Sequence, residues 1–515
     1  MTDSNQPPVA NASGRQLLRN FVTSYLGLIV SLLLSLFLTP VVLRTLGSED
    51  YGLWVVIVMA GGYVGFLGVG VETAAVRQIA AAIAVGDEDR LREIVGTVRL
   101  FFLVSGTLAG LVLLALVPFV GDLFNVRPEL ASAARVSMAL MAVVTGVGMM
   151  VNIPATTLFG AGRTDNLALF TVGTAVASQG LQIVVVLVGG GFIGLFAVNA
   201  GQCVVSFLLM GRVTTASRII PPGPTRATRA MFRELFRSGS QIFIVGLGST
   251  LAYKLDAIII GLILPAARVT PYDLGLSTAS FTRSMSTAGT SILMPTYAHS
   301  SALDDRSRQF RLWSRSILLS LAITVPMASA LVTFGQTLLH LWLGLVPPDS
   351  YEVMVVINVV FLLQLPGIQA FGLLTGAGRA SFLARLTIGP SVATLALSVG
   401  ATYWLGPVGP AVASLPQTVL LDFVALPVLC CRFLRVPIRQ YVREALTPLV
   451  VPVLAAPAIS LVLARTVGTS NELLAPIECV AVCVGTWMAL APVLFRRDEA
   501  LKRFVGSLMR RGVSR

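Results

Sequence analysis

Long apolar segments, separated by short polar stretches, dominate the chain. Fourteen of them have the length of about 20 residues that a helix needs to cross a bilayer. They cover residues 20–43, 51–72, 95–120, 131–155, 167–189, 192–211, 239–264, 274–297, 315–338, 351–373, 384–405, 410–431, 447–465 and 476–495. The pattern predicts an all-α polytopic membrane protein with about 14 transmembrane helices.

Basic residues gather in every second connection between these spans. With a cytoplasmic amino terminus, 30 of the 37 Lys and Arg residues lie in the tails and the even-numbered connections, five lie outside, and two lie within spans. This asymmetry follows the positive-inside rule, so we expect both termini in the cytoplasm. The net charge of +13 is then a signal of topology that favours contact with anionic membrane lipid and gives no indication of a nucleic-acid partner.

Composition narrows the function classes. The chain is 55% hydrophobic and 12% charged, with a mean hydropathy of +0.84. A phosphate-binding P-loop needs a Lys followed by Ser or Thr, and neither Lys254 nor Lys502 satisfies that, which disfavours ATP-driven pumping. Cys479 and Cys483 could share a helix face, but no His lies near them, so we expect apolar packing, no metal and no cofactor. The longest polar stretch, residues 212–238, is too short for a soluble catalytic domain, and we expect transport rather than enzymatic activity.

An internal repeat relates the two halves of the chain. Leu158–Arg163 (LFGAGR) and Leu374–Arg379 (LTGAGR) are 216 residues apart, and each follows the fourth span of a six-span block. A second similarity, which we call the second echo, relates Gly86–Arg92 (GDEDRLR) after the second span to residues 304–308 (DDRSR) after the eighth. Because six is even, the two blocks have the same orientation, as in transporters built from parallel repeats. The sequence therefore predicts two six-helix lobes plus two C-terminal helices.

This repeat sets the predicted domain organisation. A cytoplasmic tail precedes the N-lobe of spans one to six, a basic cytoplasmic linker joins it to the C-lobe of spans seven to twelve, and a basic loop leads into the last two spans and a basic cytoplasmic tail. The corresponding ranges are 1–19, 20–211, 212–238, 239–431, 432–495 and 496–515.

Two stretches near the amino terminus resemble a known family. Leu46–Trp54 (LGSEDYGLW) follows the first span, and Phe66–Ala80 (FLGVGVETAAVRQIA) leads to Gly86–Arg92. Both are similar to the entry region of Wzx-type polysaccharide and oligosaccharide flippases, which belong to the multidrug/oligosaccharidyl-lipid/polysaccharide (MOP) exporter superfamily. The likeness is sharpest in residues 15–100 and extends over the chain through topology and repeat.

The resemblance implies a function and its partners. It implies a protein of the bacterial inner membrane that moves an undecaprenyl-diphosphate-linked glycan from the inner to the outer leaflet, by alternating access around a cavity between the lobes. Polysaccharide polymerases are possible partners, and the sequence leaves open whether the chain needs them. In the lipid II flippase branch two extra helices form a groove for the lipid tail, and here 447–465 and 476–495 are placed to do so or to form a dimer contact.

Ionisable residues inside spans are the main candidates for the site, because a charge in the bilayer centre costs about 2.5–3.5 kcal/mol on insertion scales. Lys254 and Arg283 fall at about the same depth in consecutive spans, where they could hold a diphosphate headgroup. Alternatively, either pairs with Asp256 or extends to the membrane surface. Asp256 itself points to another side of its helix and could couple an ion or neutralise an Arg.

Charged residues at span ends are the second group of candidates. Glu72 and Arg77, at the inner end of the second span, could couple an ion or gate the cytoplasmic mouth, but a local ion pair is the simpler interpretation. Arg44 at the outer end of the first span could be a gate or part of a solvated turn. Amides within the spans could line a sugar path, although each more often joins two helices.

Three other functions stay open. A drug or cation antiporter of the same superfamily would favour acidic side chains in the cavity, whereas the candidates here are mostly cationic. A lipid II flippase would share the fold. A membrane glycan polymerase would need sizeable outer loops with acids or Arg, and the outer connections here are short.

Overall fold

A computed structural model describes most of the chain. The described residues are 14–65, 69–217, 219–220, 222–237, 239–240, 255–284, 305–344, 346–377, 379–447, 455–462, 478–481, 483–486 and 488. Throughout these ranges the regular elements are helical, which confirms the predicted all-α class. Backbone contacts divide the chain into unit 1, Met1–Thr270, and unit 2, Pro271–Arg515. The predicted lobes were defined by counting spans, so their boundaries stay a prediction.

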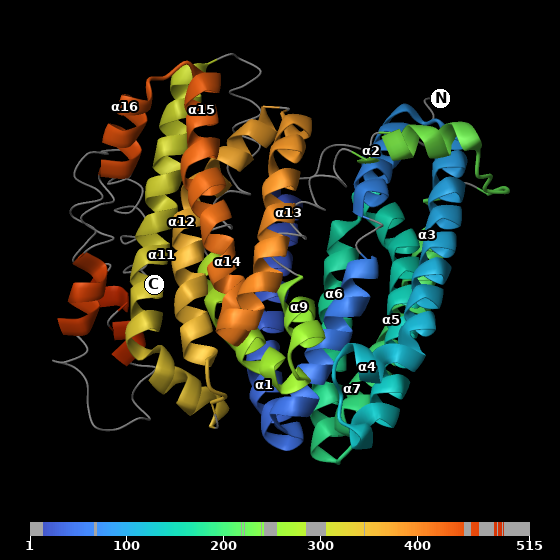
Figure 1. The fold of residues 1–515 in the computed structure, drawn as a ribbon. Helices are drawn as coiled ribbons and strands as arrows, with labels where there is room; N and C mark the ends of the chain where they lie inside the picture. The colour runs from blue at the N-terminus through green and yellow to red at the C-terminus, as the bar shows by residue number, and fades with distance from the viewer. Residues whose placement is uncertain are drawn as a thin grey trace. The chain divides into compact units, whose positions relative to one another are not determined.

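Unit 1 consists of long helices (Figure 1). Its elements are α1 (Gly14–Gly65), α2 (Val69–Val85), α3 (Glu88–Leu116), η2 (Val117–Phe119), α4 (Val120–Leu123), α5 (Pro128–Gly160), α6 (Thr164–Leu187), α7 (Gly191–Ala216), a helix over residues 229–237 that we name the linker helix, α9 (Asp256–Ile263) and η3 (Ala266–Arg268). Helix α1 spans the first two predicted segments because its two helical parts meet at Gly47, whose φ of 85° suits glycine.

Small residues bring α3 and α5 together. A Cβ on Gly106 would lie 2.6 Å from the carbonyl oxygen of Gly146, and Gly110, one turn further on, also faces α5. Lipid tails are as apolar as Leu, so helices in a membrane associate through close packing of this kind rather than through the hydrophobic effect. Exposed apolar side chains such as Leu100 and Val104 are correspondingly common on the outer face of α3.

Unit 2 is arranged around α12 (Figure 1). It begins with helical residues 271–284 and continues with α11 (Arg306–Leu343), α12 (Ser350–Gly376), α13 (Ala380–Leu405), η4 (Gly406–Val408), α14 (Gly409–Gln417), η5 (Thr418–Ala425), α15 (Leu426–Leu434), α16 (Ile438–Tyr441) and η6 (Val442–Leu446). Helix α12 packs against α11, α13, α14, η5 and α15. The segments η5 and η6 are π-helical, a conformation often found at functional sites.

Six helical segments of the described residues are long and apolar enough to cross a membrane, and they account for seven predicted spans. They are Glu88–Leu123, Pro128–Gly160, Phe170–Leu187, Gly191–Ala216, Ser350–Thr375 and Arg385–Leu434, the last of which joins spans eleven and twelve. The predicted polytopic membrane protein is therefore confirmed. Spans seven, eight, thirteen and fourteen lie partly outside the described residues.

The turn after the fourth span of each block has the same hydrogen bonds. The amide of Arg163 donates to the carbonyl of Leu158 at 3.0 Å, and the amide of Arg379 donates to that of Leu374 at 2.9 Å. This six-to-one bond closes a helix C-terminus in the Schellman manner, with Gly162 at a φ of 72° in the first copy.

The start of the third span is also the same in both blocks. Asp87 caps α3 by accepting from the amide of Arg90 at 2.9 Å, and Asp305 caps α11 by accepting from the amide of Arg308 at 2.9 Å. The two capping residues have nearly equal backbone angles, with φ of −82° and ψ of 87° and 81°. Two shared turns at equivalent places show that the sequence echoes correspond to a structural repeat.

Contacts between connections test the predicted alternation of the helices. In unit 1, Glu49 of the first connection pairs with Arg127 of the third, whereas Arg90 of the second pairs with Glu234 of the sixth. Odd-numbered connections therefore meet odd ones, and even-numbered connections meet even ones. This is the arrangement that helices crossing a membrane in alternating directions require; which face is cytoplasmic stays a prediction.

Unit 2 shows the same parity. Trp313, beside the eighth connection, stacks on Tyr441 of the twelfth, and the guanidinium of Arg379 in the tenth lies over the ring of Phe433. At the other end of α13, Trp404 is 89% exposed, as in the aromatic belts at membrane surfaces.

Candidate functional site

An arginine in the predicted eighth span, within unit 2, lies over an aromatic ring. The guanidinium carbon of Arg283 is 5.3 Å from the ring centroid of Phe361, which α12 holds in a buried position. A cation over a ring face gains about 0.5–2 kcal/mol, which offsets part of the cost of keeping a charge in the membrane. The structure thus places Arg283, the first predicted headgroup residue, half-buried beside α12.

Polar contacts continue along successive turns of α12. Gln364, one turn after Phe361, donates from Nε2 to Oγ1 of Thr418 at 3.4 Å, and both side chains are buried. One turn further, a Cβ on Gly367 would lie 2.6 Å from the backbone of Asp422, so η5 touches α12 there. Arg283 and Asp422 therefore border the same helix about six residues apart, or roughly 9 Å along its axis. We call Phe361, Gln364 and Gly367 with these partners the α12 polar stripe.

Asp422 is a candidate that sequence reasoning missed. It is buried within the π-helical segment η5, and it interacts with other groups in the structure. The signal was present in the sequence, because Asp422 is a lone carboxylate inside the predicted span 410–431. An ionisable residue in a span is a functional candidate by default, since burying its charge without purpose is costly.

In unit 1, Asp256 is the first residue of α9 and is buried. It lies close enough to Tyr63 on α1 to interact with it electrostatically. Helix α9 packs tightly on α1, because a Cβ on Gly261 would come within 2.9 Å of Val56. Lys254, the second predicted headgroup residue, lies outside the described residues, and Asp256 and Arg283 belong to different units. The two-cation clamp therefore stays a prediction.

The predicted gate residues lie within helices α1 and α2. Glu72 is half-buried and Arg77 exposed on α2, and among the described residues no ion pair joins them. Arg44 is exposed on α1. Its neighbour Glu49 instead pairs with Arg127, whose Nε lies 2.7 Å from Oε1 of Glu49.

This outer cluster also affects a second carboxyl group. Burial raises the pKa of Asp50 above its ordinary value, the adjacent Glu49 adds to that rise, and Arg127 opposes it. The pKa of the Arg127 guanidinium is raised in turn, chiefly by its hydrogen bond to Glu49. The predicted outer turn therefore forms an ion pair with Arg127, the residue immediately before α5.

Several amide side chains within the spans form hydrogen bonds between two helices. This agrees with the interpretation that such amides join helices rather than line a sugar path. Gln182 on α6 donates to Asn199 on α7 at 2.7 Å, and Gln369 on α12 donates to Ser320 on α11 at 2.8 Å. Such contacts are worth about 0.6 kcal/mol each in a membrane. Asn358 keeps a buried Oδ1 that has no hydrogen-bond partner in the described part of the chain.

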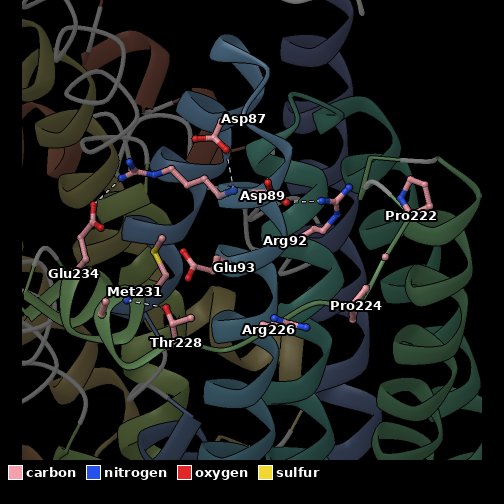
Figure 2. A pocket seen from close by; sticks show the side chains of 13 residues that line it. Asp87, Asp89, Arg92, Glu93, Pro222, Pro224, Arg226, Thr228, Met231 and Glu234 are labelled. Carbon is pink, nitrogen blue, oxygen red and sulfur yellow. Dashed lines mark hydrogen bonds and ion pairs between the residues drawn. The ribbon is translucent and has the colours of Figure 1, made fainter.

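A polar pocket lies on the even-numbered face of unit 1. Its volume is about 860 Å³, and it separates the first turn of α3 from the linker segment (Figure 2). The floor includes Arg92 and Glu93 of α3, and Pro222–Pro224 and Arg226 form the opposite wall. Arg90 crosses the pocket rim to Glu234, with 2.9 Å between Nη2 and Oε1, although both side chains are about half exposed.

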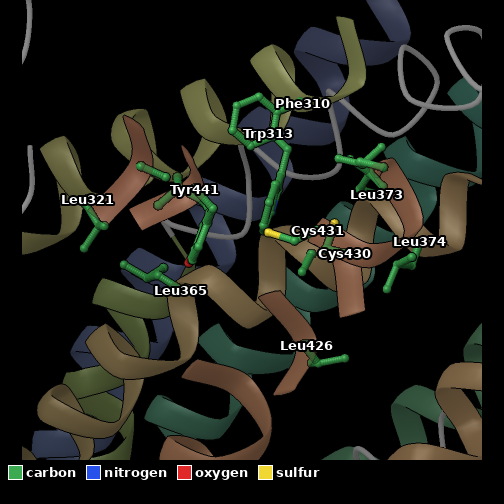
Figure 3. Packing of buried hydrophobic residues seen from close by; sticks show 14 of the residues in the cluster. Phe310, Trp313, Leu321, Leu365, Leu373, Leu374, Leu426, Cys430, Cys431 and Tyr441 are labelled. Atoms are coloured by element: carbon green, nitrogen blue, oxygen red, sulfur yellow. The ribbon is translucent and has the colours of Figure 1, made fainter. Parts of the chain in front are cut away.

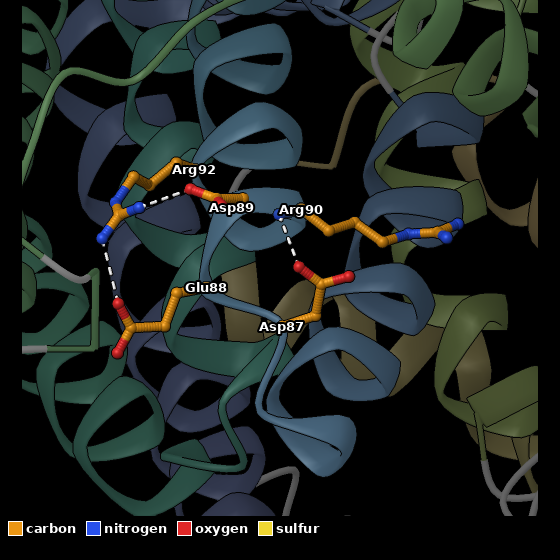
Figure 4. Close-up of polar contacts among 5 residues, drawn as sticks. All are labelled: Asp87, Glu88, Asp89, Arg90 and Arg92. Atoms are coloured by element: carbon orange, nitrogen blue, oxygen red, sulfur yellow. Dashed lines mark hydrogen bonds and ion pairs between the residues drawn. The ribbon is translucent and has the colours of Figure 1, made fainter.

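The first turn of α3 carries its own charge network (Figure 4). Arg92 pairs with Asp89 at 2.6 Å and with Glu88 at 2.9 Å, one helical turn away in each case. Acids at a helix N-terminus interact favourably with the helix dipole. These acids neutralise much of the arginine charge, so the pocket as a whole has no strong preference for an anion.

The corresponding face of unit 2 is filled by apolar side chains (Figure 3). Trp313 is fully buried, and its ring stacks on Tyr441 with centroids 4.8 Å apart and planes within 9°. Phe310 meets Trp313 edge to face, and Cys430 and Cys431 pack in the same cluster. Burial raises the pKa of the Tyr441 hydroxyl, with smaller contributions from the two thiols.

Apolar packing also holds the C-terminal spans. Cys479 and Cys483 pack against Phe334 of α11, as their spacing on one helix face predicts. The hydroxyls of Ser460 and Thr486 lie 3.3 Å apart and join the thirteenth span to the fourteenth. Whether these spans form a lipid groove or a dimer contact stays open.

Comparisons with known proteins show a family to which the sequence is similar and solved structures with a similar fold. The model of a family described as polysaccharide biosynthesis protein matches residues 41–346. A solved structure of the lipid II flippase MurJ, in an inward closed conformation, is similar with a TM-score of 0.70 and 12% identity over 93% of this chain and 99% of that one. No curated protein sequence matches the chain significantly.

Transporters of the MATE family are similar over a smaller part of the chain. An inward-facing multidrug resistance MATE transporter of the MOP superfamily has a TM-score of 0.57 and 16% identity over 81% of this chain and 98% of that one. An outward-facing one has a TM-score of 0.53 and 15% identity over 81% and 94%. At these identities the likeness establishes a shared fold.

Proposed function

We propose, from the premise that this chain belongs to the family of polysaccharide biosynthesis proteins, that it is a flippase for an undecaprenyl-diphosphate-linked oligosaccharide. The flippase-type resemblance of residues 46–92 is confirmed at the level of the family and of the MOP superfamily fold. In the proposal the glycan passes from the inner to the outer leaflet of a bacterial inner membrane by alternating access, and supplies polysaccharide biosynthesis.

Arg283 is the observation that carries the proposal. A diphosphate headgroup must leave water to cross the bilayer, and a guanidinium can replace part of its hydration with two parallel N–H bonds. The ring of Phe361 supports the cation from one side. We propose Arg283 and Lys254 as the headgroup-binding residues, with the amides and hydroxyls of the α12 polar stripe near the sugar.

Carboxylates are proposed as the coupling groups. Asp256 is the first choice, since it is buried at the start of α9, and Glu72 is the second. Asp422 joins them because it lies on the α12 polar stripe. Arg77 and Arg44 are proposed as gate residues, the first at the inner end of the second predicted span and the second at the outer end of the first. An inward proton or cation gradient would then drive the return of the empty transporter.

The extent of the fold similarity supports a lipid-linked substrate over a drug. The MATE structures account for 81% of this chain, whereas the MurJ structure accounts for 93%. The C-terminal spans are proposed to receive a polyprenyl tail. MurJ is described as a flippase of lipid II, so a peptidoglycan precursor is the competing substrate.

The test measures on which leaflet the lipid-linked glycan accumulates. Cells lacking the protein are expected to hold the undecaprenyl-linked unit on the cytoplasmic side, and wild type restores its exposure. Arg283→Ala is expected to reach the membrane at normal abundance and to lower export at least about tenfold, since a charge-assisted contact is worth about 1.5–3 kcal/mol. Arg283→Lys should recover part of the activity.

A matched control is Arg135→Ala, which removes an exposed arginine from α5. It should leave export unchanged. Full export by Arg283→Ala would remove the headgroup role, whereas normal exposure of the glycan in the deletion strain would reject the proposed substrate. Accumulated lipid II in that strain, or drug sensitivity without a glycan defect, would point to the two competing functions.

A further inference from the structure

The linker helix is fixed to unit 1 by a single apolar face. Met231 and Leu235, one turn apart, are buried in the same apolar cluster as Ile94 and Val98 of α3. The hydroxyl of Thr228 accepts from the amide of Met231 at 3.2 Å and caps the first turn. In Figure 1 this helix, drawn in green, lies across the end of α3 rather than along the bundle.

A second apolar face of the linker helix is left exposed. Phe232 and Phe236 stack with ring centroids 6.1 Å apart and planes within 12°, and they are 44% and 55% exposed. Phe101 of α3 lies beside Phe232, with centroids 6.4 Å apart. Two exposed phenylalanines on one short helix are unusual for a surface that faces only water, since aromatic burial is a large favourable term.

The third face is cationic. Arg229, Arg233 and Arg237 recur every fourth residue, so they line the side of the helix roughly opposite Met231. All three are exposed, and none forms an ion pair with another described residue. The single acid of the helix, Glu234, points instead to Arg90 across the pocket. The exposed surface therefore combines aromatic rings with an uncompensated row of positive charge.

The linker helix lies where α3 enters the membrane. Exposed apolar side chains on α3 begin at Leu100 and recur at Val104 and Leu108, whereas Arg99 is the last exposed charge before them. Phe101, which touches Phe232, adjoins this boundary. A helix lying at that level meets lipid headgroups on its charged side and the upper acyl chains on its aromatic side.

We propose that the linker helix is a binding site for anionic phospholipid, with the three arginines holding the phosphodiester headgroups and the two phenylalanines inserted beside the acyl chains. Basic residues at a membrane surface attract anionic headgroups, and the attraction falls off within a Debye length. The bound lipid anchors the segment that follows the sixth span, within unit 1. This site is separate from the substrate site, and its test needs no transport.

The experiment counts lipids bound to the purified full-length protein. The protein in detergent is titrated with phosphatidylglycerol or with phosphatidylcholine of the same acyl chains, and bound lipid is measured by native mass spectrometry. Wild type is expected to prefer phosphatidylglycerol. Arg229→Gln/Arg233→Gln/Arg237→Gln should lower that affinity at least about tenfold, and 0.5 M salt should do the same to wild type.

Two variants keep the result specific. The triple Arg→Lys variant retains the charge and should bind phosphatidylglycerol within about twofold of wild type, since headgroup attraction here depends on charge. Arg432→Gln/Arg439→Gln/Arg443→Gln removes the same charge from unit 2, where Glu444 offers partial compensation. An equal loss in this control would overturn the assignment to the linker helix, as would wild type binding both lipids equally.

Discussion

In each unit, a short helix that follows the sixth span of its block packs against the start of the third span of that block. We call this packing the closure of the unit, and its contacts differ between unit 1 and unit 2. In unit 1 the linker helix follows the sixth span and lies against the start of α3; in unit 2, α16 and η6 follow the twelfth span and pack against the start of α11. The first closure includes a half-exposed ion pair, Arg90–Glu234, beside a pocket of about 860 Å³. The second is a buried stack of Trp313 on Tyr441.

The lengths of the connecting segments explain the difference. In unit 2, α15 ends at Leu434 and α16 begins at Ile438, so a tight turn with Arg435 at a φ of 56° leads directly to the packed helix. In unit 1 the segment between Ala216 and the linker helix is much longer, and its residues Pro222–Pro224 form a pocket wall. The longer connection includes the residues that line this polar pocket, for which the short turn of unit 2 has no counterpart.

The contrast indicates which closure opens more easily. Exposed ion pairs contribute about 0–1 kcal/mol, whereas truncating a buried Trp costs about 3–5 kcal/mol. The linker helix also has the buried side chains of Met231 and Leu235, but no aromatic stack of this kind holds it, so we expect it to be docked less tightly than α16. In an alternating-access cycle, the movable segment would belong to the predicted linker between the two lobes, residues 212–238.

The largest effect is expected at the aromatic stack. Trp313→Ala removes a fully buried ring and should lower the free energy of unfolding by about 3–5 kcal/mol. The midpoint of thermal unfolding in detergent measures it. Trp313→Phe keeps a ring against Tyr441 and removes an indole N–H that has no hydrogen-bond partner in the described part of the chain, so it should cost much less. Equal losses would show that the stack is not what closes unit 2.

The docking of the linker segment in unit 1 is next. A Cβ on Gly96 would lie 2.8 Å from three backbone atoms of Arg226, so Gly96→Ala should push the segment off α3 and cost about 1–3 kcal/mol. Faster cleavage by trypsin at the linker arginines checks it. Gly62→Ala is the matched control, because nothing lies within 4 Å of its Cβ position. Equal cleavage of the two variants would contradict the close contact.

Much of the fold could be predicted from the sequence, because a membrane restricts the structures that can span it to very few. Span length, basic residues in alternate connections and the repeated turns all follow from local requirements, and the caps at Asp87 and Asp305 confirm the weaker of the two echoes. The sequence did not predict that the first two spans would meet in a single kinked helix, α1. A kink at Gly47 depends on how the flanking helices pack.

Less of the site could be predicted from the sequence, because the contacts that define it join residues far apart in the chain. Arg283 could be selected as a charge within a span, but its support from Phe361 could not. The ion pair of Glu49 with Arg127 joins residues 78 positions apart, and periodicity carries no information on such pairs. Asp422, by contrast, could have been selected from the sequence, because it too is an ionisable residue within a predicted span.

Alkaline pH should act on unit 2 through Tyr441. Its buried hydroxyl has no hydrogen-bond partner among the described residues, so Tyr441→Phe should raise the free energy of unfolding by up to about 1 kcal/mol. Because burial raises the pKa of Tyr441, the neutral form is favoured in the folded state, and stability is lost as pH rises from about 10, the unfolded value, through the raised one. Unfolding midpoints from pH 8 to 11 should fall more for wild type than for the variant. Parallel curves would exclude this linkage.

The smallest effect is expected at the ion pair of unit 1, and it separates the two closures most directly. Arg90→Glu and Glu234→Arg should each weaken the docking of the linker helix by up to about 1 kcal/mol, and the double swap should restore most of it. Hydrogen exchange of the amides in residues 229–237 reports the docking. Raising salt from 0.05 to 0.5 M should speed exchange there in wild type by screening the pair, roughly to the level of the single variants, and leave residues 438–446 unchanged because their contact is apolar. A salt response in both segments, or in neither, would show that charge does not distinguish the two closures.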